Sequence, residues 1–347
     1  MTKNSYSKYK LAWFPDKLNS LKFGNVIEPI NIRIKPTNRC CHNCYFCVYR
    51  HEISSMHEHC NRTDEIPLYK MNEIIEDITQ MGVQGITWSG GGETLVHKNI
   101  IEILETTIKN KLNFSLITNG QKIYGDIAEL LKRSKWIRVS MDYYSSESFI
   151  ESKRGSDSMF NDLCKNIKSF TSNTDHDIGV NYIITEKNYK FLEESIKFVI
   201  DLGFKNIRYS PIWTPNFEEY HQYLFHTVIH TLKELREKYS DQIQIYDSYK
   251  IAEKALPRTY SKCYFQQVVP VIGADLNVYN CHNTAYTDHG LMGSIKDIKF
   301  SELWNSETIK THFDTFNPIE KCNHECANDA KNKYINELMN CYGDCYV

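Results

Sequence analysis

Three cysteines in one short loop constrain this chain more than any other feature. Cys40, Cys44 and Cys47 follow the spacing CxxxCxxC, and Phe46 directly precedes the last of them. Three thiolates from one tight loop can hold three irons of a [4Fe–4S] cluster and leave the fourth iron without a protein ligand. Such an open iron is useful where a small molecule must chelate it and receive an electron. Cys41 lies in the variable gap of the motif, and we expect it to be a spectator.

The loop is also open to two other interpretations. A structural zinc site could use His42 or Cys41 as a fourth ligand. A disulfide framework is the other, but the chain starts with Met-Thr-Lys-Asn-Ser-Tyr and shows no signal peptide. This start predicts a cytoplasmic protein whose thiols stay reduced. We favour the cluster because of the motifs that follow the loop.

Length and charge limit the classes of partner. A chain of 347 residues predicts one large domain with smaller additions. We expect an N-terminal extension over residues 1–28, a core over 29–240 and a cysteine-rich part over 241–347. The net charge of −2 gives no electrostatic footprint for nucleic acid. No apolar run approaches the roughly 18 residues of a membrane span, so no membrane partner is expected either.

Strand-like and helix-like segments alternate through the core. Helical periodicity marks the segments between the strands, at 72–81, 100–108, 123–131, 160–170 and 191–202. Repeated strand–helix units predict a parallel sheet, and six units are too few for an ordinary eight-stranded barrel. The predicted fold is therefore α/β, a curved, open six-unit sheet. The six strand candidates are 31–34, 85–89, 113–118, 136–140, 178–184 and 206–209.

A glycine motif follows the second of these strands. Ser89-Gly90-Gly91-Gly92-Glu93-Thr94 would let backbone approach a ligand closely, and Glu93 adds a negative charge for an ammonium group. Together with the cysteine spacing, this motif resembles the signature of the radical S-adenosylmethionine (radical SAM) enzymes. The resemblance implies a partial (β/α)6 TIM-like barrel in which SAM binds the open iron. It implies that reductive cleavage of SAM yields a 5′-deoxyadenosyl radical, and that Gly91, Gly92 and Glu93 bind the methionyl amine.

Polar residues at the other strand ends acquire roles through the same resemblance. In parallel sheets, ligand-binding residues gather at the carboxyl ends of the strands. Turn chemistry and helix capping are the plain alternatives for these residue types. The residues expected to border SAM are Asn119, Ser140 and Asp142 at strand ends and Asn181 on the fifth strand, with Phe46 near the adenine.

A second group of cysteines lies in the last third of the chain. Residues 273–282 read as a β-hairpin that delivers Cys281 at its end. The order of Cys263, Cys281, Cys322 and Cys326 resembles the twitch domain, a small α+β extension of radical SAM enzymes. The resemblance implies that these four thiols hold an auxiliary [4Fe–4S] cluster, with zinc as the alternative. Cys341 and Cys345 could replace Cys326, hold a further centre or have no ligand role.

The predicted reaction is hydrogen abstraction from a small metabolite, sugar or aminocyclitol-like, followed by dehydrogenation with the auxiliary cluster as electron acceptor. The partners expected are this small-molecule substrate and an external electron donor such as flavodoxin or ferredoxin. Epimerisation is an alternative in which a thiol such as Cys164 donates hydrogen, although a small buried side chain is the plainer role for that residue. Arg208 could contact substrate or assist deprotonation.

Modification of a ribosomal peptide is the rival enzymatic hypothesis. The 39 residues before Cys40 are too few for the peptide-binding winged helix that often precedes the barrel in such enzymes, which favours the small metabolite. This preference is an analogy at the family level. A zinc-stabilised binding module is the non-enzymatic alternative.

Overall fold

A single ten-stranded sheet organises the chain, as the computed structural model of residues 7–51, 54–249, 258–322 and 326–341 shows. Its strand order is β10-β9-β8-β1-β2-β3-β4-β5-β6-β7, and β1 to β7 run parallel. The strands are β1 (Asn31–Ile34), β2 (Gly85–Trp88), β3 (Asn113–Thr118), β4 (Ile137–Ser140), β5 (Ile178–Ile184), β6 (Asn206–Pro211), β7 (Gln244–Asp247), β8 (Val271–Ile272), β9 (Asn277–Tyr279) and β10 (Leu291–Ser294).

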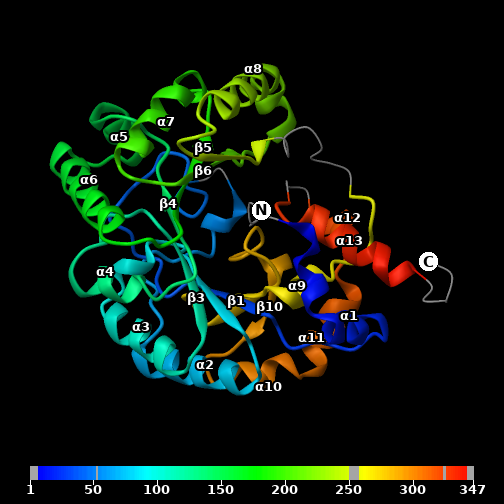
Figure 1. The fold of residues 1–347 in the computed structure, drawn as a ribbon. Coiled ribbons are helices and arrows are strands. Elements are labelled where there is room, and N and C mark those ends of the chain that lie inside the picture. Colours follow the sequence, from blue (N-terminus) through cyan, green and yellow to red (C-terminus); the bar gives the residue numbers. More distant parts are fainter. Residues whose placement is uncertain (1–6, 52–53, 250–257, 323–325, 342–347) are drawn as a thin grey trace.

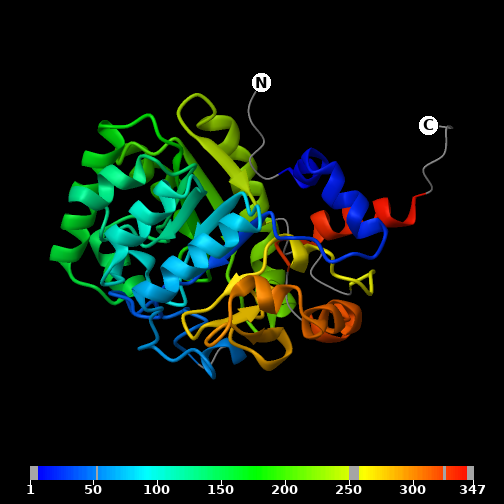
Figure 2. The same cartoon turned by 90° about the horizontal axis from the view of Figure 1, so that it is seen from below.

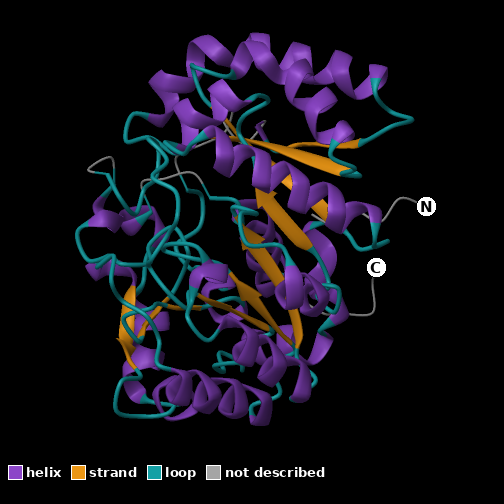
Figure 3. Cartoon of the chain, turned by 90° about the vertical axis from the view of Figure 1, so that its left-hand side faces the viewer, coloured by secondary structure: helices purple, strands orange, loops and turns teal. Residues whose placement is uncertain are grey.

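The helices between the parallel strands cover the outer face of the curved sheet (Figure 1; Figure 3), and we call its inner, concave side the lumen. The helices of this layer are α2 (Leu68–Gln80), α3 (Ile100–Lys109), α4 (Gly125–Leu131), α5 (Ser146–Lys153), α6 (Asp157–Ser172), α7 (Leu192–Asp201) and α8 (Phe217–Lys238). The remaining helices are α1 (Pro15–Lys22), α9 (Phe265–Val268), α10 (Phe300–Trp304), α11 (Glu307–Thr315), α12 (Pro318–Lys321) and α13 (Asp329–Asn340).

Alternation along β1 shows why the lumen is polar. Ile32 and Ile34 are fully buried in the apolar core, where they join the buried face of α2. Because successive strand residues point to opposite faces, Arg33 between them points to the inner side of the sheet. Its register partner Thr87 on β2 lies on that same side. The helical layer therefore packs on isoleucine, while the lumen receives charged and hydroxyl side chains.

The predicted α/β class with a parallel, barrel-like sheet is confirmed, and three of the six strands have the predicted bounds. A seventh parallel strand, β7, was not predicted. It follows α8 directly and pairs with β6, so the sheet continues past the predicted boundary at residue 240. The C-terminal hairpin continues the sheet on the other side, because β8 pairs parallel with β1 (Figure 2). The division into three parts stays a prediction.

A smaller apolar cluster joins the two ends of the described chain. Leu11 and Leu21 near the start pack with Val268 on α9 and Ile335 on α13. The N-terminal helices (dark blue) lie beside α13 (red) in Figure 1 and Figure 2. No helix within the described ranges combines the length and apolar character needed to cross a membrane.

Candidate active site

The cysteine loop leaves β1 and is held by the end of α5. The backbone N–H of Asn43 donates to the carbonyl of Lys153 at 3.0 Å, and that of Tyr45 donates to the carbonyl of Ser152 at 3.3 Å. The N–H of Cys47 donates to the carbonyl of Cys44 at 3.2 Å, which forms a tight turn inside the loop. Backbone bonds to a helix end therefore fix the segment that carries the thiols.

A buried ion pair lies under this loop. The ammonium of Lys153 pairs with the carboxylate of Asp142, and both side chains are almost completely buried. The same ammonium lies 5.1 Å from the ring centre of Phe46. Burial raises the pKa of the Cys44 thiol to about 11, and the Lys153 charge opposes this rise. Asp142 thus lies beside the cysteine loop with its carboxylate paired to lysine, and its contact with SAM stays a prediction.

The glycine motif packs against the start of the cysteine loop. A Cβ on Gly92 would lie 2.0 Å from the carbonyl oxygen of Arg39, and one on Gly91 would lie 2.2 Å from Oδ1 of Asn38. The N–H of Glu93 donates to the Arg39 carbonyl at 2.7 Å. Only glycine permits such close approach of the two segments.

Glu93 is buried and fully engaged within the protein. Its Oε1 accepts hydrogen bonds from the Thr118 hydroxyl at 2.6 Å and from the Leu95 N–H at 3.1 Å. Its Oε2 accepts from the Asn119 N–H at 2.6 Å. Burial raises the pKa of this carboxyl group, while these hydrogen bonds oppose the rise. The structure therefore shows Glu93 fastening the glycine motif to the end of β3, and its contact with a methionyl amine stays a prediction.

Other predicted site residues lie at the end of β3 or on the inner face of the sheet. The side-chain amide of Asn119 donates to Sγ of Cys41 at 3.2 Å and lies 3.9 Å from Sγ of Cys40. Ser140, Asn181 and Arg208 are successive register partners on β4, β5 and β6, so they form one row across the inner face. The structure brings Asn119 to the cysteine loop and places the row beside it.

The two predicted catalytic residues differ in position. Arg208 lies in the lumen row, and its Nε donates to the Ser248 hydroxyl at 2.8 Å. Cys164 lies on α6 in the outer helical layer, where it packs against the core. Burial raises the pKa of its thiol to about 11, and the charges that act on it are Lys168 and Asp201. This position gives no support to a hydrogen-donating role for Cys164.

The C-terminal cysteines come together from separate segments. Burial raises the pKa of the Cys263 thiol, and the charges of Cys326, Cys281 and Cys322 raise it further, so these four thiols lie within electrostatic range of one another. Cys281 follows β9 and Cys322 follows α12. Within the described residues, no three His, Cys, Asp or Glu side chains are arranged to hold a single metal ion.

Of the two terminal cysteines, the structure describes Cys341. Cys341 is exposed at the end of α13, and its carbonyl accepts a hydrogen bond from Lys22 at 2.7 Å. Cys345 lies outside the described residues.

Sequence reasoning missed the basic and aromatic residues of the lumen. Arg33 and Lys35 alternate with isoleucines in Asn31-Ile32-Arg33-Ile34-Lys35, and this alternation was a signal that both point inward. Tyr49 and Tyr286 carried no such signal, because they lie in loops. The Tyr286 hydroxyl donates to Oδ1 of Asn38 at 2.7 Å. This bond connects the C-terminal part to Asn38, the residue that packs against Gly91.

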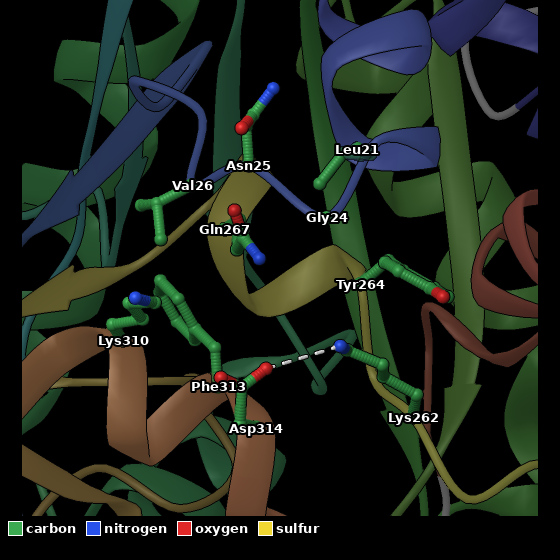
Figure 4. A pocket seen from close by; sticks show the side chains of 10 residues that line it. All are labelled: Leu21, Gly24, Asn25, Val26, Lys262, Tyr264, Gln267, Lys310, Phe313 and Asp314. Atoms are coloured by element: carbon green, nitrogen blue, oxygen red, sulfur yellow. Dashed lines mark hydrogen bonds and ion pairs between the residues drawn. The ribbon is translucent and has the colours of Figure 1, made fainter.

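A shallow pocket lies apart from these residues. Its empty volume is about 280 Å³, which includes open solvent, and the Lys262–Asp314 ion pair at 3.4 Å spans part of its wall (Figure 4). None of the predicted site residues lines it. The pocket therefore adds nothing to the candidate site.

The residues of the lumen fit an iron–sulfur cluster with SAM. Three thiols share one fixed loop, and the glycine motif packs against the start of that loop. Two polar atoms at this place, Oγ of Ser89 and Oδ1 of Asp142, are buried without a hydrogen-bond partner among the described residues. Buried polar groups are normally satisfied, so these two atoms are consistent with a ligand that completes the site.

Comparisons with known proteins agree with this geometry. The sequence model of the Radical SAM superfamily matches residues 34–210, which is half of the chain. The antilisterial bacteriocin subtilosin biosynthesis protein AlbA of Bacillus subtilis is 27% identical over 230 residues, 59% of this chain and 48% of that protein. A probable GTP 3′,8-cyclase of Methanocaldococcus jannaschii is 29% identical over 185 residues, 52% of this chain and 58% of that protein. The chain thus spans about half the length of the curated relatives it matches.

A solved structure shows the same fold over most of the chain. SuiB of Streptococcus suis, bound to its precursor peptide SuiA, superposes with a TM-score of 0.66 at 15% identity, covering 91% of this chain and 74% of SuiB. The family match begins at Ile34, the last residue of β1, and includes the cysteine loop, the glycine motif, β2 to β5 and most of β6. The chain belongs to the radical SAM superfamily, whose enzymes use a [4Fe–4S] cluster and S-adenosylmethionine.

Proposed function

We propose that this enzyme oxidises a peptide substrate, with Cys40, Cys44 and Cys47 as ligands of the SAM-binding cluster and an auxiliary cluster as electron acceptor. The observation that carries the proposal is the pairing of β8 with β1. This pairing brings the hairpin that ends in Cys281 beside the strand that leads to the first cysteine loop. Both cysteine groups therefore border one lumen.

The chain's own residues would divide the work as follows. The cluster and SAM, when bound, supply a 5′-deoxyadenosyl radical that abstracts hydrogen from an unactivated carbon. Gly91 and Gly92 keep the motif open to SAM, and Glu93 anchors it to β3. Ser140 and Asn181 offer hydrogen bonds to a bound molecule in the lumen.

The four C-terminal thiols would hold the auxiliary cluster. Cys263, Cys281, Cys322 and Cys326 lie within electrostatic range of one another, and four thiolates complete the coordination of a [4Fe–4S] cluster. Such a cluster supplies an acceptor for the electron of the substrate radical. The proton of that oxidation needs a base, and the lumen row offers no carboxylate, so we place deprotonation at a group of the substrate or at solvent.

The names of the relatives support a peptide over the small metabolite favoured by the sequence. AlbA acts in the biosynthesis of subtilosin, and SuiB binds a precursor peptide. Arg33 and Arg208, which influence each other electrostatically, face the lumen from β1 and β6 and would suit an acidic or carboxylate group of the substrate. A small metabolite is the second candidate, because GTP 3′,8-cyclases are also among the relatives.

Deuterium transfer tests the proposal. The anaerobically reconstituted enzyme is incubated with SAM, dithionite and deuterated candidate substrates, peptides in one series and small metabolites in the other. We expect deuterium in 5′-deoxyadenosine only with a peptide, together with a product that is lighter by two hydrogens. Deuterium transfer from small metabolites and not from peptides would show that the substrate is a small metabolite. A product of unchanged mass would contradict oxidation.

A further inference from the structure

Lys35 is the first residue after β1, and it is buried with 1% of its surface exposed. Its ammonium donates to the hydroxyl of Tyr49 at 2.8 Å and to the carbonyl of Gly90 at 3.3 Å. It also lies 4.2 Å from the ring centre of Tyr49 and 5.6 Å from that of Tyr286. Two aromatic faces and one peptide carbonyl therefore surround a positive charge.

No carboxylate among the described residues forms an ion pair with this ammonium. Asp275 acts on it electrostatically, but the oxygens of Asp275 already accept hydrogen bonds from Asn277 and Tyr279. Arg33 acts on it with the same sign of charge. Burial, with a smaller effect of Arg33, lowers the pKa of Lys35 to about 7. A buried charge is costly unless it is paired. The described residues give Lys35 no such counter-charge.

The contacts of Lys35 lead to both predicted cofactor sites. Gly90 begins the glycine motif, and Tyr49 comes two residues after Cys47. The Tyr49 hydroxyl also lies 3.5 Å from the carbonyl of His282, the residue after Cys281. Tyr286, whose ring faces the ammonium, reaches Asn38 beside the glycine motif. Lys35 thus touches the segments that would hold SAM and the first cluster, and its partner Tyr49 reaches the segment of the second.

Lys35 lacks a negative counter-charge, and the cluster and SAM would supply negative charge. Three thiolates outweigh the positive charge of an oxidised [4Fe–4S] core, and reduction adds a further negative charge. SAM, when bound to the cluster, would add a carboxylate. A fixed ammonium in this surrounding stabilises the more negative, reduced state of the cluster.

We propose that Lys35 is a positioning residue whose counter-charge is the cluster–SAM assembly, so that its ammonium raises the reduction potential of the SAM-binding cluster and orients the glycine motif through Gly90. This proposal rests on the assignment of Cys40, Cys44 and Cys47 as cluster ligands. It adds a residue that the cysteine and glycine motifs do not contain. Lys35 acts through charge and through Gly90, without contact with the substrate.

The test is an EPR-monitored redox titration of the reconstituted full-length enzyme, with and without SAM. Lys35→Met keeps the length of the side chain and removes its charge, whereas Lys35→Arg keeps the charge. We expect the Met variant to have a lower reduction potential and to bind SAM about tenfold more weakly, and the Arg variant to remain near the wild type. Lys35→Gln keeps a hydrogen-bond donor without the charge and replaces the Met variant if that chain does not fold.

A matched control is Lys70→Met on α2. Lys70 is buried to a similar degree, but it pairs with Glu73 at 2.5 Å and donates to the carbonyl of Ile298 at 2.9 Å. Removal of the Lys70 charge should leave the reduction potential of the SAM-binding cluster unchanged. If the uncharged Lys35 variants keep the wild-type reduction potential while the wild-type cluster responds to SAM, the proposal for Lys35 is wrong but the ligand assignment stands. A wild-type chain without any SAM-responsive cluster overturns the ligand assignment as well.

Discussion

The two cysteine groups border the same lumen but are assembled in different ways. Cys40, Cys44 and Cys47 come from one loop that follows the strand β1 and is bonded to the end of α5. Cys263, Cys281, Cys322 and Cys326 come from segments separated by up to 63 residues, the span from Cys263 to Cys326. A local loop is fixed by its neighbours in the chain, whereas the second group needs the whole C-terminal part to fold around it. Substitutions elsewhere in the chain should therefore disturb the first cysteine group less than the second.

The largest expected effect is that of Cys44→Ala. Loss of one of three thiolates should remove the first cluster, lower the iron content from about eight to about four per chain and abolish 5′-deoxyadenosine formation from SAM. Iron analysis and chromatography of the products measure both effects. Cys41→Ala is the control, and it should keep its iron and its SAM cleavage. If the Cys44 variant still forms 5′-deoxyadenosine, the assignment of this loop as the site of the SAM-binding cluster is wrong.

Cys281→Ala separates the second group from the first. We expect it to lose about four irons and the oxidised product, while SAM cleavage stays within about tenfold of the wild type because the first loop is intact. The measurement is 5′-deoxyadenosine and substrate product from the same reaction mixture. Full substrate oxidation by this variant would contradict the acceptor role of the auxiliary cluster.

Gly92→Ala tests the close approach between the glycine motif and the cysteine loop. The added Cβ would lie 2.0 Å from the Arg39 carbonyl, so we expect a loss of about 1–3 kcal/mol in the free energy of unfolding and weaker SAM binding. Denaturant unfolding and equilibrium binding of SAM measure these two quantities.

The control for that prediction is Gly24→Ala. Gly24 has a φ of +77° and open space around it, so alanine there should destabilise the chain by about 1 kcal/mol without touching the site. If both variants bind SAM equally well, the glycine motif has no special role in SAM binding.

The smallest expected effect is a pH dependence in the chain without cofactors. The folded pKa of Lys35 is about 7, below the value of 10.5 for a free lysine, so the unfolded chain binds more protons between these values. Stability contributed by Lys35 is then present at high pH and is lost as the pH falls toward 7. The groups that act on this amine are Arg33, Cys60, Cys47 and Asp275.

The comparison of wild type with Lys35→Met isolates this effect. Between pH 7.5 and 8.5, urea unfolding should show the wild type gaining up to about 1.4 kcal/mol per pH unit relative to the variant. A constant difference across this range would show that the folded amine keeps its proton, and so that another group already neutralises it.

Local pattern explains which parts of the fold could be predicted. The strands β1, β3 and β5 have the predicted bounds, because each is a short segment with several aliphatic or aromatic residues between polar segments. β7 was missed because its four residues, Gln244–Asp247, include only one aliphatic side chain. Its place in the sheet comes from pairing with β6, which depends on distant parts of the chain.

The candidate site divides in the same way. The cysteine and glycine motifs are local, and the sequence identified both. The engagement of Asp142 by Lys153, and of Glu93 by the end of β3, depends on how separate elements pack. A lysine is seldom buried, so sequence alone gave no reason to place Lys35 inside the protein. The role of such residues is decided by tertiary contacts.

The most direct test of the central claim uses the variant Cys281→Ala, in which the first loop would hold the only cluster. Its reduced form is examined by EPR before and after addition of SAM under anaerobic conditions. If the three-cysteine loop leaves one iron open for SAM, the signal will change its shape and g-values when SAM is added. A cluster signal that SAM leaves unchanged would show that the fourth iron is already occupied, and would contradict the account.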